Sequence, residues 1–306
     1  MDKDFMPNLS QEDRERAWQA LNRLRALMSA RTVDRKNALD ALVGEAIAYR
    51  TGPELKALLE FQRKFPHMAP YNVMLLHVQN PGIAYALRSA EWRKRFGRKV
   101  KPAARPYVVL RTMGPVDFVF DLSDTEPVAP VDDRIPALAM NPFPTRGEAN
   151  TTQLRNLIHS CGKAGMQVEE RDLGTALAGQ VRRVADRMRD FHIVLNSKHT
   201  VTQRFGTLAH EMAHVLCGHL GPGPRGYWPD RARLHLSVGV KEFEAEMVAY
   251  LFTVRQGIGI GSADYLSGYL DGAGEVPYFS LDAVLKADGV LESMAEGRYR
   301  PSKKKS

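Results

Sequence analysis

One short pattern in the sequence combines residue types and a spacing that can hold a metal ion: His210-Glu211-Met212-Ala213-His214. Residues four apart in a helix lie on one face, so the imidazoles of His210 and His214 can reach a single ion. Glu211 is turned by about 100° from His210, which places its carboxylate beside the ion. There it can take a proton from a water that zinc activates. The pattern predicts a zinc site of the peptidase type, with His210 and His214 as ligands and Glu211 as the general base.

The bare pattern also has a simpler explanation, in which both histidines are core residues of an amphipathic helix. The residues around the motif are strongly apolar, as expected of a catalytic helix that is buried: Phe205, Leu208, Met212, Val215 and Leu216. This context favours the metal site over the core explanation.

A catalytic zinc ion needs a third protein ligand and an open position for water. Three glutamates follow in the run from Lys241 to Glu246, and the first of them, Glu242, is 28 residues beyond His214. That length allows a loop and an antiparallel return of the chain. Glu242 and Glu246 share one helix face, whereas Glu244 is about 200° away from Glu242. Helix periodicity alone leaves open which of the two faces is turned toward the histidines.

The second half of the chain is predicted to place helices and strands around this motif. A helix near Thr151–Lys163 and a strand near Gln167–Arg171 precede a second, apolar strand at Phe191–Asn196. A long helix from about Thr202 to Leu220 carries the histidines. After a loop rich in Gly and Pro, a helix near Val238–Arg255 carries the three glutamates.

The first half begins with helices and continues with strands. A helical pattern extends from Ser10 to about Phe65, in pieces that include 33–49 and 53–65, and a further helix is expected between Pro70 and Asn80. Two β-rich runs follow at Tyr107–Leu110 and Val116–Phe120, and Gly114-Pro115 between them predicts a hairpin turn. The whole chain is therefore predicted to be of the α+β class, with two domains.

Five prolines cluster between Glu126 and Gly147, which is typical of a linker. We therefore predict a first domain of residues 1–125, a linker of residues 126–147 and a second domain of residues 148–297. Residues 298–306 form a short basic tail, which we interpret as a solvated end of the chain.

The positive charge of the chain is concentrated in one window. The formal net charge is +8, which favours an acidic partner, with nucleic acid the first candidate. The window Arg88–Arg111 holds nine basic residues and one acid, so its net charge equals that of the whole chain. Such a window can follow a phosphate backbone through counterion release, without reading the base sequence. The residues that we predict to contact nucleic acid are Arg93, Lys94, Arg95, Arg98, Lys99, Lys101 and Arg105.

Aromatic residues interleave with these charges and could stack on the bases of a single strand. However, Trp92 and Phe96 are four apart, as residues of a buried helix face are. We therefore assign Trp92 to the core.

The composition is that of an ordinary globular protein, with 44% hydrophobic and 25% charged residues. No apolar run approaches the roughly 18–20 residues that span a bilayer, and the first residues lack the pattern of a secretory signal. Two cysteines, Cys161 and Cys217, are too few for a disulfide framework. These features predict a cytoplasmic protein with no membrane partner.

The segment around the histidines resembles the ImmA/IrrE-type metallopeptidases. Residues Arg204–His214 are similar to their R-F-T-L-A-H-E-L-G-H helix, Leu195-Asn196 matches the end of their upstream strand, and Glu242–Glu246 matches their E-x-x-A-[NDE] helix. The resemblance implies that Glu242 is the third zinc ligand and that Glu246 accepts a hydrogen bond that orients a ligand histidine. Glu244 is then expected to be a solvated charge.

The first half resembles another module, the N-terminal single-stranded-DNA-binding domain of ArdC-type antirestriction proteins. The matching residues are Asn72, Leu75-Leu76, Gln79, Pro81, Trp92, Gly97–Val100 and Phe120–Thr125. The sequence departs from that pattern where Lys101–Ala104 lacks the second glycine and where Asp124 replaces glutamine. ArdC-type proteins also join this module to a metallopeptidase-like second half. The resemblance implies single-stranded DNA as a partner.

Three functions stay open on the sequence. The first is a DNA-binding protein with a zinc metallopeptidase-type domain, which protects incoming single-stranded DNA as an antirestriction protein. The second is a regulatory metalloprotease whose protein substrate is a repressor or a toxin partner. The third is a binding protein with a structural zinc ion, against which the intact Glu211 argues, because a structural site needs no general base.

Several other polar residues near the motif carry weaker hypotheses. Arg233, His235 and Tyr250 are candidates for stabilising an oxyanion, and the sequence does not choose among them. His219 lies five residues past His214, off the ligand face, and is predicted to be structural. Cys217 is predicted to be a small buried hydrophobic residue.

Overall fold

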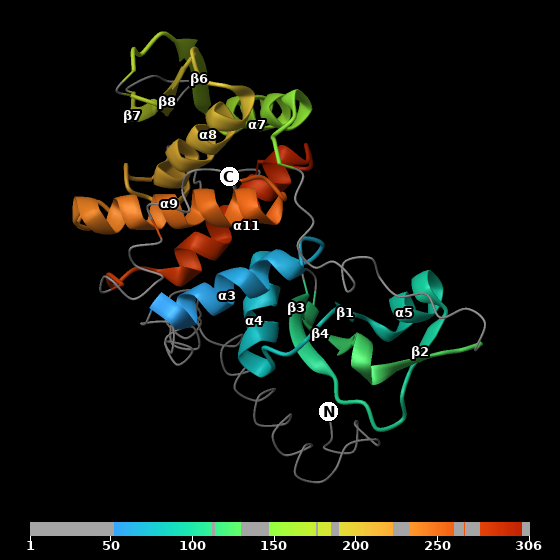
Figure 1. Ribbon diagram of the computed structural model, residues 1–306. Helices are drawn as coiled ribbons and strands as arrows, with labels where there is room; N and C mark the ends of the chain where they lie inside the picture. Colours follow the sequence, from blue (N-terminus) through green and yellow to red (C-terminus); the bar gives the residue numbers. More distant parts are fainter. Residues whose placement is uncertain are drawn as a thin grey trace, which may run out of the picture. The chain divides into compact units, whose positions relative to one another are not determined.

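The computed structural model describes residues 52–111, 114–129, 147–175, 177–184, 190–222, 233–259, 266 and 276–301. Internal contacts divide the chain into two compact units, one of residues 1–48 and 60–144 and the other of residues 49–59 and 145–306. Both units combine helices and strands, which confirms the predicted α+β class (Figure 1). The predicted helices before residue 50, most of the predicted linker and the end of the basic tail lie outside the described residues.

Prolines and glycines set the bounds of the helices in the first half of the chain. α3 runs from Gly52 to Lys64, and the division between the units falls within it. α4 (Pro70–Gln79) starts with a proline, whose fixed φ suits the first turn of a helix. α5 (Ser89–Phe96) ends at Gly97, which adopts the left-handed conformation with a φ of 61°.

The strands of the first unit form two small antiparallel sheets. In one, the order is β1-β4-β3, with β1 at Ala86–Leu87, β3 at Tyr107–Arg111 and β4 at Gly114–Asp121. In the other, β2 (Arg98–Val100) pairs with β5 (Thr125–Pro127).

Two sequence predictions for this region need correction. Gly114 and Pro115 are not a turn: Gly114 pairs with Arg111 across the β3–β4 ladder, so the connection falls at residues 112 and 113, outside the described residues. Glu126 and Pro127, at the start of the predicted linker, lie in β5 because they pair with β2. Glycine and proline locally favour a turn or a linker, but pairing with a neighbouring strand places these residues in β4 and β5.

The core of the first unit includes Trp92, as predicted. Its side chain is fully buried, and its indole Nε1 donates a hydrogen bond to the carbonyl oxygen of Phe120 at 2.9 Å. It packs with Tyr85 and Leu87. Trp92 is therefore not available to stack on a base.

Two amide side chains of α4 cover the outer edge of β3. Asn72 donates to the carbonyl oxygen of Leu110 at 3.0 Å and accepts from its backbone N–H at 2.9 Å. Gln79 makes the same pair of bonds with Val108, both at 2.8 Å. Each amide thus takes the place of a neighbouring strand on an edge that would otherwise be open. These two residues of the DNA-binding resemblance hold the fold together.

The second unit is built in layers around α8 (Val201–Leu216). On one side α8 packs against β7 (Gly179–Arg183) and β8 (Phe191–Asn196), and on the other against α9 (Val238–Arg255) (Figure 1). α11 (Leu281–Ala295) contacts both α9 and α8. The two helices that carry the predicted metal ligands are therefore neighbours.

A three-stranded sheet covers the other side of α8. Its order is β6-β8-β7, with β6 (Met166–Arg171) parallel to β8 and β7 antiparallel to it. α7 (Thr151–Lys163) packs against β6. Every residue of the central strand β8 is buried, whereas β7 is an edge strand among the described residues.

Capping residues fix where the two helices of the site begin. Thr200 accepts a hydrogen bond from the backbone N–H of Gln203, whose side chain bonds back to Thr200, and Ser237 caps α9 in the same position. α8 ends at Leu216, four residues earlier than predicted, and Gly218 follows in the left-handed region with a φ of 77°. Among the described residues, no helix has the length and apolar character needed to cross a bilayer.

Candidate metal centre

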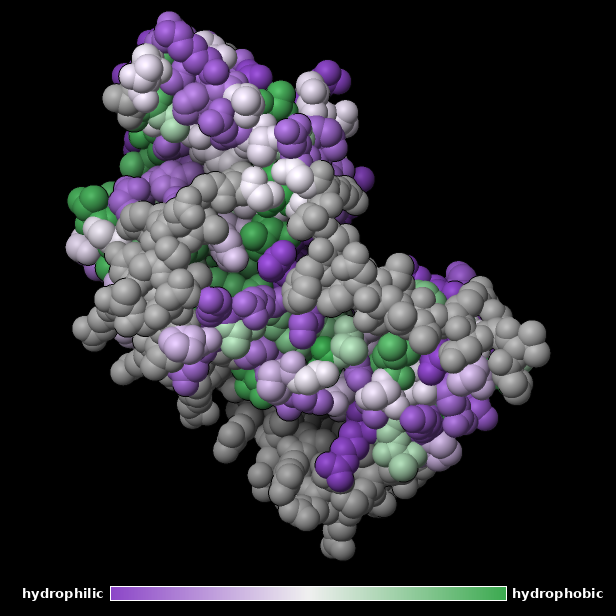
Figure 2. All heavy atoms as spheres, viewed as in Figure 1, coloured by the Kyte–Doolittle hydropathy of each residue, from purple (hydrophilic) through white to green (hydrophobic). Residues whose placement is uncertain are grey.

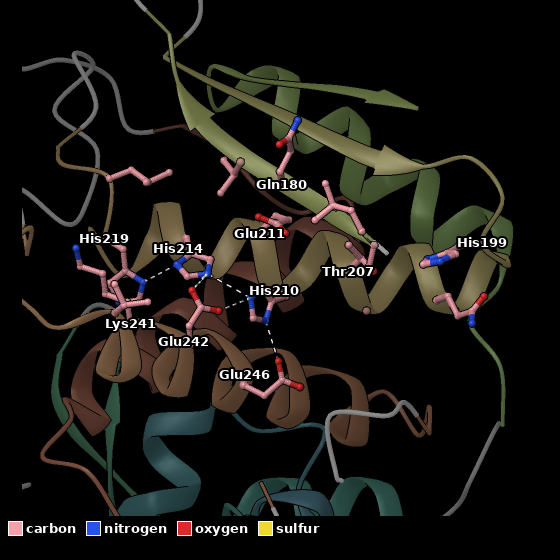
Figure 3. A pocket seen from close by; sticks show the side chains of 18 of the residues that line it. Gln180, His199, Thr207, His210, Glu211, His214, His219, Lys241, Glu242 and Glu246 are labelled. Atoms are coloured by element: carbon pink, nitrogen blue, oxygen red, sulfur yellow. Dashed lines mark hydrogen bonds and ion pairs between the residues drawn. The ribbon is translucent and has the colours of Figure 1, made fainter. Parts of the chain in front are cut away.

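The three predicted metal ligands converge on one point between α8 and α9 (Figure 3). The Nε2 atoms of His210 and His214 are 3.2 Å apart. The carboxylate of Glu242 lies 3.4 Å from His210 Nε2 through Oε2 and 3.6 Å from His214 Nε2 through Oε1. Helix periodicity did not decide which face of α9 meets the histidines. In the fold it is the face that carries Glu242.

These separations fit a zinc ion. With bonds of about 2.0–2.1 Å, the ligand atoms of a tetrahedral zinc site are roughly 3.3–3.4 Å from one another. The three separations, of which the two from Glu242 are to different carboxylate oxygens, lie within about 0.2 Å of that range. Two imidazole nitrogens that face each other so closely need a cation or a proton between them, because their lone pairs repel. The donor set is therefore suited to zinc, with His210, His214 and Glu242 as the residues that would hold it.

The second nitrogen of His210 is held by Glu246, one turn beyond Glu242 on α9. His210 Nδ1 donates to Glu246 Oε2 at 2.8 Å. This bond fixes the orientation of the imidazole, so that Nε2, the other ring nitrogen, faces Glu242 and His214. Glu246 thus has the geometry of a residue that orients a ligand histidine.

The ionisable groups of the site shift one another's pKa values. Burial alone would lower the pKa of His210, but hydrogen bonds to Glu242 and Glu246 and the charges of nearby carboxylates raise it to about 10. The pKa of His214 is lowered, first by burial and then by the positive charge of His210. Without metal, the pair of histidines therefore carries one positive charge.

Glu211 lies on a different side of α8, toward the strands (Figure 3). Its side chain is buried, and its carboxylate accepts a hydrogen bond from the backbone N–H of Val181 in β7. Burial raises the pKa of Glu211 to about 7, against the opposing effects of His210 and of the Val181 N–H group. Glu211 is thus beside the convergent ligands and not one of them, as a general base must be.

Gly179 allows β7 to lie this close to α8. A β-carbon at Gly179 would be 2.6 Å from Cγ2 of Thr207 and 3.5 Å from Oε1 of Glu211. The first distance is well inside van der Waals contact, so any side chain at this position would push β7 away. The missing side chain therefore keeps the Val181 N–H within reach of Glu211.

A pocket of about 940 Å³ opens over these groups. It is lined by residues 177–181, along β7 and just before it, by α8 from Thr202 to His214, and by α9 residues that include Lys241 and Glu242. Two apolar side chains that line it are also exposed, Leu177 by 41% and Val238 by 73%. A pocket of this size can take a ligand of several residues beside the metal centre.

Glu244 is not a solvated charge, so that prediction is wrong. Its side chain is fully buried, and its carboxylate accepts hydrogen bonds from Arg233 (2.6 and 2.7 Å), from Nε2 of His219 (2.9 Å) and from the backbone N–H of Ser280 (2.8 Å). A signal existed in the sequence: apolar residues occur on all sides of α9, which is typical of a helix with no solvent face.

Of the three candidates for an oxyanion-stabilising group, none lines the described pocket. The guanidinium of Arg233 is bound to Glu244, and the exposed His235 is not one of the lining residues. Tyr250 lies on α9 one turn beyond Glu246 and is not one of the lining residues. Lys241 does line the pocket, and its amino group donates to the carbonyl oxygen of Leu234 at 3.1 Å.

The predicted nucleic-acid contacts lie in the first unit and differ in exposure. Arg98 is buried, and its guanidinium bonds to the side chain and the carbonyl oxygen of Thr125 at 2.8 and 3.0 Å. It therefore holds β2 against β5 and does not offer its charge to a ligand. The other six are exposed: Arg93, Lys94, Arg95, Lys99, Lys101 and Arg105. Figure 2 shows hydrophilic residues on the described surface of the first unit, between apolar and grey atoms.

Comparisons with known proteins do not assign this chain to a family. No protein-family model matches the chain, and no curated protein matches it. A solved structure that is similar is the crystal structure of the antirestriction ArdC protein from the R388 plasmid, in its metal-free form. It is 14% identical, with a TM-score of 0.35, and the alignment covers 75% of this chain and 85% of that one. A likeness of that strength decides neither fold nor function.

Proposed function

We propose that the second unit is a zinc-dependent hydrolase of the peptidase type. The observation that carries the proposal is the convergence of His210, His214 and Glu242 within 3.2–3.6 Å of one another, with Glu211 beside them in one open pocket. A structural zinc site is closed by protein ligands and has no use for a buried carboxylate beside it. The open pocket and Glu211 therefore favour catalysis.

The residues of the chain have distinct tasks in such a reaction. Zinc, when bound, would polarise the scissile carbonyl group and lower the pKa of water. Glu211 takes a proton from the attacking water and returns it to the leaving amine nitrogen. The N–H of Val181 holds the Glu211 carboxylate in place for both steps. Glu211 itself is buried, which limits competition from bulk water at the general base.

An edge strand in the pocket lining supports an extended peptide as the substrate. β7 lines the pocket and is the edge strand of its sheet among the described residues. An extended peptide can add to such an edge through main-chain hydrogen bonds. The exposed side chains of Leu177 and Val238 offer apolar contacts to its side chains.

The test is removal and return of the metal. The zinc-loaded protein is incubated with a mixture of synthetic peptides, and the products are identified by mass spectrometry. We expect cleavage, its loss after treatment with a chelator and dialysis, and its recovery with one equivalent of zinc but not with magnesium. Cleavage that survives complete metal removal, or a zinc-loaded protein that cleaves no peptide, would contradict the proposal.

We further propose that the first unit binds single-stranded DNA through its exposed basic residues. The supporting observation is that eight of the nine basic residues between Arg88 and Arg111 are exposed, Arg98 being the exception. Backbone charge then supplies the affinity without base specificity. A protein that protects incoming single-stranded DNA would combine these two units, and the resemblance of the sequence to ArdC-type antirestriction proteins supports that function. The alternative is a regulatory protease whose DNA-binding unit brings it to a repressor or a toxin partner.

Reversing three exposed charges on α5 is expected to weaken DNA binding. In the variant Arg93→Glu, Lys94→Glu and Arg95→Glu, affinity for a short single strand should fall at least about tenfold at low salt. The salt dependence should flatten by about 0.7 for each phosphate contact that is lost. Fluorescence anisotropy at several salt concentrations measures both.

The matched control for that variant reverses three exposed charges of the second unit: Arg155, Lys163 and Arg300. It has the same net charge, so it should bind DNA almost as the wild type does. Equal weakening in both variants would mean that only the net charge matters. In that case the assignment to α5 would be wrong.

A further inference from the structure

The metal ligand His214 is held from behind by a second histidine. Its Nδ1 lies 3.0 Å from Nδ1 of His219, and Nε2 of His219 lies 2.9 Å from Glu244 Oε2 (Figure 3 shows the first of these bonds). The side chains of His219 and Glu244 are fully buried. The chain of contacts therefore runs from the metal centre into the core, away from solvent.

The turn after α8 brings His219 to this position. Gly218 adopts a φ of 77°, which reverses the chain beyond the last helical turn. The backbone N–H of His219 then donates to the carbonyl oxygen of His214 at 2.9 Å. The imidazole of His219 is thereby placed against the imidazole of His214, although five residues separate them.

Hydrogen-bond chemistry decides which atom donates in each contact from Glu244 through His219 to His214. The Glu244 carboxylate is surrounded by donors, two from Arg233 and one from the backbone of Ser280, so it acts as an acceptor toward His219 as well. His219 Nε2 is then the donor. A neutral imidazole has one donor and one acceptor nitrogen, so His219 Nδ1 accepts. The proton in the 3.0 Å contact must therefore belong to His214 Nδ1.

The charge balance of the buried groups supports a neutral His219. Arg233 and Glu244 form a two-bonded ion pair with no net charge. A protonated His219 would add a second cation to a carboxylate that Arg233 already neutralises, which is unfavourable away from water. Cys217, His219 and Glu244 also lie close enough together to hold a metal ion. The ion pair of Arg233 with Glu244 argues against a site there, because Arg233 already supplies the positive charge. Burial also raises the pKa of the Cys217 thiol, which keeps it protonated.

We infer that His219 and Glu244, with Arg233, are positioning residues that hold the proton of His214 on Nδ1 and so keep its Nε2 lone pair directed at the metal centre. The inference rests on the proposed zinc site and extends it. His210 is oriented by a carboxylate and His214 by a neutral imidazole, so the two ligands receive unequal support. Glu244 also ties the start of α11 and the segment before α9 to the centre through Ser280 and Arg233.

The first arm of the test uses the unaltered full chain without metal. Histidine labelled with nitrogen-15 reports in long-range proton–nitrogen spectra which ring nitrogen carries the proton. We expect the proton on Nε2 of His219 and on Nδ1 of His214. A proton on Nδ1 of His219, or on both of its nitrogens, would overturn the inference whether or not the protein binds zinc.

The second arm compares two substitutions of His219 by zinc affinity, measured in competition with a chromophoric chelator. His219→Phe removes the acceptor and should weaken zinc binding by about 10–100-fold, as loss of such support does at other sites. His219→Gln should recover most of the affinity, because its amide can accept from His214 and donate to Glu244. The absorption bands of cobalt in place of zinc should shift in the Phe variant and return in the Gln variant.

A purely structural role predicts something else. Both variants would then lose thermal stability without metal, and both would keep the zinc affinity of the wild type. That result overturns the inference, and so does a Gln variant that fails to recover affinity while folding normally. A wild-type protein that binds no zinc would instead refute the proposed function, and the spectra of the metal-free chain would still decide the inference.

Discussion

Glu211→Gln is expected to abolish peptide hydrolysis while zinc binding stays nearly unchanged. The amide keeps the shape of the side chain and can still accept the hydrogen bond from Val181 N–H, so the fold should be preserved. It cannot take a proton from water, and loss of a positioned general base lowers the rate by about 100–10,000-fold. The three metal ligands are untouched. The expected result is therefore a folded, zinc-loaded and nearly inactive protein.

The measurement is the rate of peptide cleavage together with the zinc content of the same sample. Glu296→Gln is the matched control, because it makes the same change of chemistry at an exposed position outside the pocket. Hydrolysis at the wild-type rate in the Glu211→Gln protein would remove Glu211 from the reaction. Loss of zinc along with activity would instead mean that Glu211 supports the metal.

The same variant separates the two biological hypotheses. If Glu211→Gln loses cleavage but still protects single-stranded DNA from nucleases, DNA binding is sufficient for protection. If protection disappears with cleavage, hydrolysis is part of the function. The charge-reversal variant of α5 is the converse test, because it should lose DNA binding and keep cleavage. If protection is then lost, DNA binding is necessary for it.

Elements with a strong periodic pattern and clear caps were predictable from the sequence. The predicted bounds of α7, α9 and β8 agree with the fold, because Asn150 and Ser237 cap the helices and β8 is an uninterrupted apolar run. β7 was not predicted at all. Its residues Gly179–Arg183 alternate weakly, and the strand forms because β8 and α8 provide partners from distant parts of the chain.

In the site, too, local features were predictable and contacts between distant segments were not. The pairing of His210 with His214 is local, since residues four apart in a helix always share a face. The face of α9 that meets them was open on spacing alone, and only the resemblance pointed to Glu242. Glu244 was misjudged because its partners, His219, Arg233 and Ser280, come from three separate segments that only the fold brings together.

The three glutamates of α9 should respond to alanine substitution in three different ways. Glu242→Ala removes one of three ligands, so zinc affinity should fall by more than the roughly 10–100-fold expected for loss of the orienting Glu246. Its side chain is partly exposed, so stability without metal should change little. Glu244→Ala should lower stability as well as zinc affinity, because it removes the ion-pair partner of Arg233 and the acceptor that holds His219 against His214. Breaking a fully buried pair costs about 3–5 kcal/mol, and the loss here should be smaller because 18% of the Arg233 side chain is exposed.

Metal content after dialysis, by elemental analysis, and thermal unfolding of the metal-free proteins distinguish the three variants. Each glutamate is the control for the other two, because all three substitutions remove the same side chain from one helix. The expected order of zinc loss at unchanged stability is Glu242 first and then Glu246, with Glu244→Ala recognised by its low melting temperature. A Glu242→Ala protein that retains zinc would mean that the third ligand lies elsewhere. A Glu244→Ala protein of wild-type stability would contradict the buried ion pair with Arg233 and the support that it gives to His219.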